Sequence, residues 1–196
     1  MRAITEELCG LEISKRQVSA LSQQLDEEIQ RWRERPRERS YPYLVVDARY
    51  EKVRRGGQVV SQAVLLVVGI SPEGYREILG VGVADSENET SWSEVFAELS
   101  RRGLEGVRYV VSDDHQGLRR ALERHFQGAL WQRCQVHLIR NVLNLASRKD
   151  RGAVLEQLRS ITAAPTREAA RETLGRAVGV LEKKHPKPRW SLQNRP

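Results

Sequence analysis

Apolar side chains recur three or four positions apart near the N-terminus, which is the spacing of one face of an α-helix. The stripe consists of Val18, Leu21, Leu25, Ile29 and Trp32. Ser14 stands before it as an N-cap, and Gly10 supplies a turn before the cap. The spacing therefore predicts an amphipathic helix within residues 1–35.

After residue 40 the helical pattern gives way to short apolar runs that each lead into an aspartate. Tyr43–Val46 is followed by Asp47, and Val107–Ser112 is followed by Asp113. Runs of this length with many β-branched or aromatic residues are typical of central strands that are covered on both faces. We therefore expect two buried strands, each ending at a carboxylate.

Turn signals divide the segment between these runs. Gly56 and Gly57 predict a tight hairpin turn before a strand at 59–70. Ser71–Gly74 places Pro and Gly where a type I turn uses them, before a strand around 78–83. Three consecutive antiparallel strands are expected.

Helical and strand patterns then alternate. Ser91–Glu94 resembles a capping box and begins a helix that ends at Gly103. A crossover helix at this place predicts that the Asp113 strand runs parallel to the Asp47 strand, so that both acids reach the same edge of the sheet. A helix, a short strand at 129–131 and a helix that opens at Cys134 complete the order β-β-β-α-β-α-β, the ribonuclease-H-like arrangement with a mixed sheet.

From Arg151 onward the pattern is helical, and Pro165 separates two helices. The inward positions are Val154, Leu155, Leu158 and Ile161, then Leu174, Val178 and Leu181. The expected organisation is a helical segment with a basic linker (1–39), a ribonuclease-H-like core (40–148), a helical insertion (149–184) and a basic tail (185–196) that is expected to be disordered.

The composition favours an anionic partner. The chain has 196 residues, of which 33 are Lys or Arg and 26 are Asp or Glu, giving a formal charge of +7. This balance suits DNA, RNA or an anionic membrane surface, but no apolar run is long enough to span a bilayer. The sequence has only two cysteines, Cys9 and Cys134, so a disulfide framework is not expected. This cysteine content fits a protein of the reducing cytosol.

Two acids at one sheet edge suggest metal-dependent chemistry. Mg²⁺ prefers oxygen ligands and is commonly held by one or two carboxylates together with a substrate phosphate. Asp47 and Asp113 would therefore suit phosphoryl transfer on nucleic acid. The competing interpretation is that each aspartate forms a turn or caps a helix.

Basic residues suggest where nucleic acid would bind. The helix that begins with Lys15, Arg16 and Gln17 resembles the second half of a helix-turn-helix, of which the first half is mostly absent. An amphipathic helix that packs on the next domain or on a second copy of the chain explains the pattern equally well. Alternating arginines from Arg31 to Arg39 indicate either a solvated linker or a contact with phosphates.

Three sequence blocks resemble a known family. Tyr41–Arg54 is similar to the first catalytic block of the mutator-type transposases of bacterial insertion sequences, and Val111–Leu118 is similar to their second block. Trp131–Asn141 resembles their Cys-x-x-His signature, here formed by Cys134 and His137. The resemblance covers residues 10–150.

The resemblance implies a DNA transposase that binds the ends of its element, hydrolyses a phosphodiester and joins the freed strand to target DNA. It implies an Asp-Asp-Glu triad with Mg²⁺ or Mn²⁺, in which Asp47 and Asp113 are the first two ligands. Asp114 is expected to cap a helix, although its position leaves an exchange of roles with Asp113 open. Lys15, Arg16, Gln17, Lys52 and Arg54 are expected to contact DNA, in a cytoplasmic homodimer or higher oligomer.

The third acid of the triad has no matching segment. Glu156, Glu168, Glu172 and Glu182 lie in amphipathic patterns that fit surface positions. The chain is therefore expected to be truncated at both ends. The alternative to an active transposase is an inactive DNA-binding or dimerising remnant that at most modulates an intact transposase.

Cys134 and His137 lie one helical turn apart and form the family signature. Structural Zn²⁺ normally takes four protein ligands, and no second pair has suitable spacing. Packing or hydrogen bonding near the active-site edge is the preferred interpretation, and half of a metal site is the other.

Overall fold

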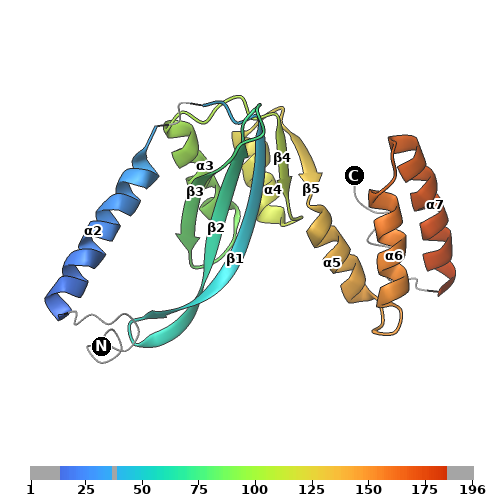
Figure 1. Ribbon diagram of the computed structural model, residues 1–196, viewed down its shortest axis with the longest axis horizontal. Helices are drawn as coiled ribbons and strands as arrows, with labels where there is room; N and C mark the ends of the chain where they lie inside the picture. The colour runs from blue at the N-terminus through green and yellow to red at the C-terminus, as the bar shows by residue number, and fades with distance from the viewer. Residues whose placement is uncertain (1–13, 37–38, 185–196) are drawn as a thin grey trace. The chain divides into compact units, whose positions relative to one another are not determined.

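The computed structural model describes residues 14–36 and 39–184, and in this part of the chain five strands form one mixed sheet beside six helices (Figure 1). The elements are α2 (Lys15–Glu34), β1 (Tyr43–Arg55), β2 (Gln58–Ile70), β3 (Arg76–Ala84), α3 (Glu89–Arg101), β4 (Tyr109–Ser112), α4 (Gln116–His125), β5 (Leu130–Arg133), α5 (Gln135–Leu145), α6 (Arg151–Thr162) and α7 (Arg167–Lys184). The strand order across the sheet is β3-β2-β1-β4-β5.

The hairpin of β1 and β2 is the longest piece of the sheet. Its strands pair antiparallel from Tyr43 opposite Ile70 to Arg55 opposite Gln58. Gly56 and Gly57 form the turn with φ angles of 59° and 82°, which glycine adopts without a steric penalty. The predicted hairpin and the antiparallel pairing of β2 with β3 are confirmed.

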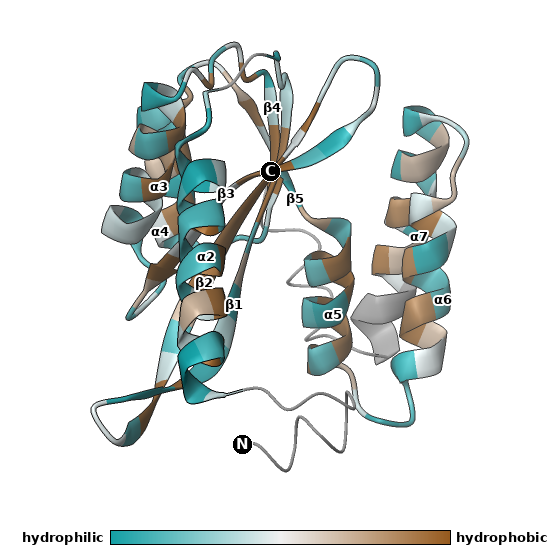
Figure 2. Cartoon of the chain, turned by 60° about the vertical axis from the view of Figure 1, so that its left-hand side comes forward, coloured by the Kyte–Doolittle hydropathy of each residue, from teal (hydrophilic) through white to brown (hydrophobic). Residues whose placement is uncertain are grey.

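The chain divides into two compact units, residues 1–110 with 115–130, and residues 111–114 with 131–196. In the first unit the core lies between one face of the sheet and the helices α3 and α4 (Figure 2). Its largest fully buried side chains include Leu44, Val46, Leu65, Trp92 and Phe96. The rings of Trp92 and Phe96 stack with centroids 5.6 Å apart.

Close backbone packing holds α3 against β3. A Cβ atom added at Gly82 would lie 2.5 Å from Cγ2 of Val95, so only a glycine lets the helix approach this closely. The start of α3 corrects the sequence analysis, because Asn88 is the N-cap and forms a capping box with Ser91. The predicted box from Ser91 to Glu94 is therefore wrong. Ser91 is 7% exposed and lies inside the first turn.

The second unit contains the helices α5, α6 and α7. Its core consists of Val142, Ala146, Val154 and Leu158, with Leu138 packed against it. Val154 and Leu158 were expected to face inward and do so. Leu145 is 44% exposed, because Ala146, the next residue, takes the buried place at the end of α5.

Helix α2 confirms the amphipathic helix predicted near the N-terminus. Ser14 is its N-cap, and Gln17 completes a capping box by accepting from the backbone N–H of Ser14 at 2.8 Å. At the other end, Arg102 donates to the carbonyl of Arg33 and, at 2.7 Å, to the carbonyl of Leu79. These bonds connect the end of α2 to β3 within the first unit.

Several sequence predictions fall outside the described residues. They concern Cys9, the turn at Gly10 and the rest of residues 1–13 before the helix that begins at Lys15, the middle of the basic linker at 37–38, and the tail at 185–196. Among the helices that are described, none combines the length and apolar composition that crossing a bilayer requires.

Candidate functional site

Asp47 lies within β1 and does not end it. The strand runs from Tyr43 to Arg55, and Asp47 pairs with Leu66 of β2. The predicted strand end at Asp47 is wrong, because the Gly56–Gly57 turn lets the two strands stay paired far beyond the acid. Asp47 is exposed because it alternates with the buried residues Leu44 and Val46.

The face of the sheet that carries Asp47 is apolar and partly open to solvent. Directly paired residues of antiparallel strands point to the same face, so Val45 and Val68 lie beside Asp47 and Leu66. Tyr43 is 46% exposed and Val45 is 38% exposed. The prediction that this strand is covered on both faces is therefore wrong: Asp47 stands on a hydrophobic surface that is only partly covered.

Asp113 follows the last residue of β4, as predicted, and the backbone there is held firmly. Ser112 is 1% exposed. Its hydroxyl accepts from Nε1 of Trp131 at 2.9 Å and donates to the carbonyl of Asp113 at 2.7 Å. Its carbonyl accepts from the backbone N–H of Cys134 at 2.6 Å. Residues of the second and third sequence blocks thus fix the position at which Asp113 leaves the strand.

Asp114 is turned inward and does not cap a helix. Its Oδ2 lies 3.8 Å from Nη1 of Arg133, and the two side chains are 6% and 13% exposed. The N-cap of α4 is His115, whose Nδ1 accepts from the backbone N–H of Leu118 at 3.3 Å. The predicted capping role of Asp114 is therefore wrong. Its carboxylate belongs to a shielded ion pair next to Asp113.

Cys134 and His137 lie in the second unit, at the start of α5. Cys134 is the N-cap of the helix without a side-chain cap bond, and its backbone N–H bonds Ser112 as described. Both side chains are half-buried. Within the described ranges no group of three or more His, Cys, Asp or Glu residues is arranged to hold a metal ion. This backbone bond joins Cys134 to the end of β4.

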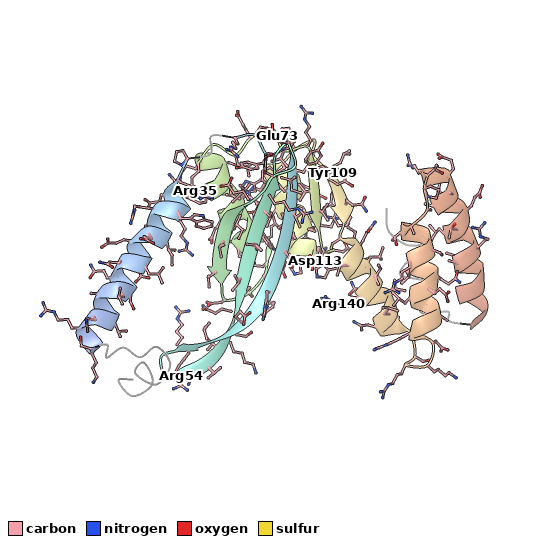
Figure 3. All side chains as sticks on the ribbon, viewed as in Figure 1. Arg35, Arg54, Glu73, Tyr109, Asp113 and Arg140 are labelled. Carbon is pink, nitrogen blue, oxygen red and sulfur yellow. The ribbon has the colours of Figure 1, made fainter. Side chains whose placement is uncertain are left out.

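The predicted DNA-binding residues occupy two separate elements of the first unit. Lys15 and Arg16 are exposed in the first turn of α2, whereas the side chain of Gln17 is engaged in the capping box. Lys52 and Arg54 are exposed on β1, and Figure 3 shows Arg54 at the far end of the hairpin.

The two acids fall in different units, Asp47 in the first and Asp113 in the second. Their convergence on one metal site stays a prediction. Sequence reasoning missed the Arg133–Asp114 ion pair and the bond from Trp131 to Ser112. Both partners of each stand inside the quoted blocks, but nothing in their spacing indicates that they meet.

Comparison with known proteins gives a consistent result. The family model "Transposase, Mutator family" matches residues 1–195. The chain is 42% identical over 187 residues to the transposase for insertion sequence element ISRM5 of Rhizobium meliloti, covering 95% of this chain and 47% of that protein. It is 44% identical over 187 residues to the transposase for IS406 of Burkholderia multivorans, covering 94% and 48%. The chain thus spans about half the length of the curated relatives it matches.

Among solved structures, the chain is similar to part of a simian T-cell lymphotropic virus intasome in complex with a PP2A regulatory subunit. The TM-score is 0.31 at 11% identity, with 83% of this chain and 59% of that chain covered. A likeness of this size carries no argument about the fold.

Proposed function

The chain belongs to the Mutator family of transposases, and we propose that it supplies two catalytic acids of a transposase that cuts and rejoins the DNA of an insertion element. The observation that carries this proposal is the family match over residues 1–195, which includes the blocks around Asp47 and Asp113. The relatives are named as transposases for insertion sequence elements of bacteria.

We assign the sheet to the ribonuclease-H-like fold. The element order β-β-β-α-β-α-β and the strand order β3-β2-β1-β4-β5 support this assignment. In that arrangement β1 and β4 are neighbours, as they are here, and each carries one of the proposed acids at or just after its paired residues. Asp47 and Asp113 would then approach each other from adjacent strands.

The two carboxylates would hold Mg²⁺ or Mn²⁺, since hard divalent ions prefer oxygen ligands. Such an ion would supply charge stabilisation at a phosphodiester and would favour attack by a water oxygen. The hydrogen bonds of Ser112 hold the backbone where Asp113 begins, and the carboxylate of the adjacent Asp114 is paired with Arg133. Asp113 therefore keeps the ligand role, and Asp114 a positioning role.

The proposed reaction has two steps at phosphorus. A water oxygen attacks the phosphodiester at the element end, and the bond to the 3′ oxygen breaks, which leaves a 3′ hydroxyl. That hydroxyl attacks a phosphodiester of the target DNA, and the 3′ oxygen of the target leaves. The number of phosphodiester bonds is unchanged in the second step, so it needs no external energy source.

We propose DNA and a second copy of the chain as the partners, acting together in the cytoplasm where bacterial DNA lies. Exposed apolar residues on α2 support a second copy: Leu21 and Leu25 are each 57% exposed and Ile29 is 42% exposed.

The proposal is tested by incubating the purified chain with plasmid DNA and Mg²⁺ or Mn²⁺. Metal-dependent nicking that disappears in Asp47→Asn and Asp113→Asn, and persists in the matched surface variant Asp85→Asn, supports catalysis by the chain itself. DNA binding without any nicking supports the alternative, a binding fragment whose chemistry needs further residues. Nicking that survives both substitutions removes Asp47 and Asp113 from the mechanism.

A further inference from the structure

The outer half of the β1–β2 hairpin is a two-stranded ribbon beyond the reach of β3. The pairing of β2 with β3 ends at Ala63 opposite Ala84, whereas β1 and β2 stay paired to Arg55 opposite Gln58 (Figure 1). Residues 51–62 therefore form a ribbon that β3 does not extend. A two-stranded ribbon of this kind is narrow enough to lie in a groove of duplex DNA.

One face of the ribbon carries cations without carboxylate partners. Lys52 and Arg54 lie two residues apart and so point to the same face, where they pair with Ser61 and Val59. All four side chains are exposed. Neither Lys52 nor Arg54 has an ion pair among the residues that the structure describes, and this face of the ribbon contains no acid.

The opposite face carries cations that are already neutralised. Arg49 forms an ion pair with Glu51 on the same strand. Nη1 of Arg55 lies 3.3 Å from Oδ1 of Asp85, which also accepts from the side-chain amide of Gln62 at 3.3 Å. The hairpin thus has two arginines with acidic partners on one face and two unpaired cations on the other.

We propose that the face formed by Lys52, Arg54, Val59 and Ser61 contacts the sugar-phosphate backbone of duplex DNA. This inference rests on the proposed function. It specifies which face of the hairpin contacts DNA, and that the contact is with the sugar-phosphate backbone. Alternate residues of a strand stand about 6.8 Å apart, so the two cations can engage separate phosphates. The small side chain of Ser61 opposite Lys52 allows close approach and offers a hydroxyl donor.

Phosphate contacts of this kind position DNA without selecting its sequence. Their affinity comes largely from the release of counterions, and each neutralised phosphate steepens the dependence of binding on salt. A cation that is already paired with a carboxylate releases few counterions. The two faces of the hairpin should therefore contribute differently, although Lys52 and Arg54 carry the same formal charge as Arg49 and Arg55.

The matched test compares Lys52→Gln/Arg54→Gln with Arg49→Gln/Arg55→Gln, which remove the same formal charge from opposite faces. Binding of the full chain to a short duplex of arbitrary sequence is followed by fluorescence anisotropy over a range of salt concentrations. We expect the first double variant to raise Kd about tenfold at low salt. It should also make the fall of the logarithm of the association constant with the logarithm of salt concentration shallower, by about 2 in slope. The second double variant should leave the slope nearly unchanged.

Equal salt slopes for the two double variants overturn the proposal. The proposal is also overturned if Lys52→Gln/Arg54→Gln weakens binding to vesicles rich in anionic lipid as much as it weakens binding to DNA, because that would indicate a general attraction to anionic surfaces. If the unaltered chain fails to bind duplex DNA, both this proposal and the DNA partner of the proposed function are contradicted. Metal binding by Asp47 and Asp113 is measured separately, so its failure does not affect the result for the ribbon.

Discussion

Arg133 and Asp114 illustrate how much of the region around Asp113 depends on one shielded pair of charges. Their side chains are 13% and 6% exposed and lie 3.8 Å apart. At this burial, removing one partner leaves a charge with little access to water, whereas removing both does not. The pair therefore stabilises the segment between β4 and α4 in the correct arrangement.

The first prediction concerns this pair. Asp114→Asn should lower the free energy of unfolding by about 3 kcal/mol, because the guanidinium of Arg133 stays shielded without its carboxylate. Asp114→Asn/Arg133→Gln should recover part of that loss. Chemical denaturation of the two variants and the unaltered chain measures both values, and a double variant that is less stable than the single variant would contradict the ion pair.

The second prediction concerns His125, whose ring lies 6.0 Å from that of Phe96 and whose buried Nε2 has no hydrogen-bond partner among the described residues. Burial, assisted by the charge of Arg124, lowers the pKa of His125 below its ordinary value of 6.5. The unfolded chain then binds more protons than the folded chain as the pH falls through that value, so stability falls with it.

Thermal unfolding at several pH values between about 7 and 5.5 measures this effect, with His125→Leu as the comparison, because leucine does not titrate. The unaltered chain should lose more stability over this range than the variant. Identical pH profiles would show that the protonation of His125 does not differ between the folded and unfolded states.

At the same scale, the sequence predicted where Asp113 lies along the chain better than how the side chain of its neighbour Asp114 is held. The position of Asp113 after a strand was predictable because the apolar run before it is local. The direction of the Asp114 side chain was not, because it depends on Arg133 on another strand. A short polar residue before a helix fits a cap equally well, and only the tertiary partner decides.

Among the elements, turns and caps with one local solution were predicted correctly. Gly56 and Gly57 supply the positive φ angles that a two-residue hairpin turn needs, and Ser14 caps α2. The start of α3 was misplaced because Ser91–Glu94 has the sequence of a capping box, whereas Asn88 is the N-cap and forms the box with Ser91. The helix begins earlier because Ser91 and Trp92 are buried in the core, and burial of this kind depends on tertiary packing.

The third prediction belongs to helix α2. If two copies pair through its exposed stripe, Leu21→Gln/Leu25→Gln should convert a dimer into a monomer without unfolding the first unit, because α2 has no buried residues. Sedimentation equilibrium measures the mass, and circular dichroism checks the fold. Ser19→Gln, which lies away from the stripe, is a control on the same helix. A chain that is monomeric before substitution would contradict the proposed dimer.

Across the whole molecule, the order of helices and strands could be predicted because periodicity changes clearly along the chain. The exposure of the sheet could not. Tyr43–Val46 is apolar at every position, which is typical of a strand buried on both faces, yet only Leu44 and Val46 are buried. Sequence alone does not say which apolar face meets a neighbour, and the face that carries Asp47 is the more exposed one.

The central claim is that Asp47 and Asp113 bind the same divalent ion, and titration of the chain with Mn²⁺ followed by electron paramagnetic resonance tests it most directly. The account predicts that Asp47→Asn and Asp113→Asn each weaken Mn²⁺ binding, that the double variant is hardly worse than either, and that Asp85→Asn has no effect, since ligands of one ion act together. Additive losses from the two substitutions, or unchanged affinity in either single variant, would contradict a shared site.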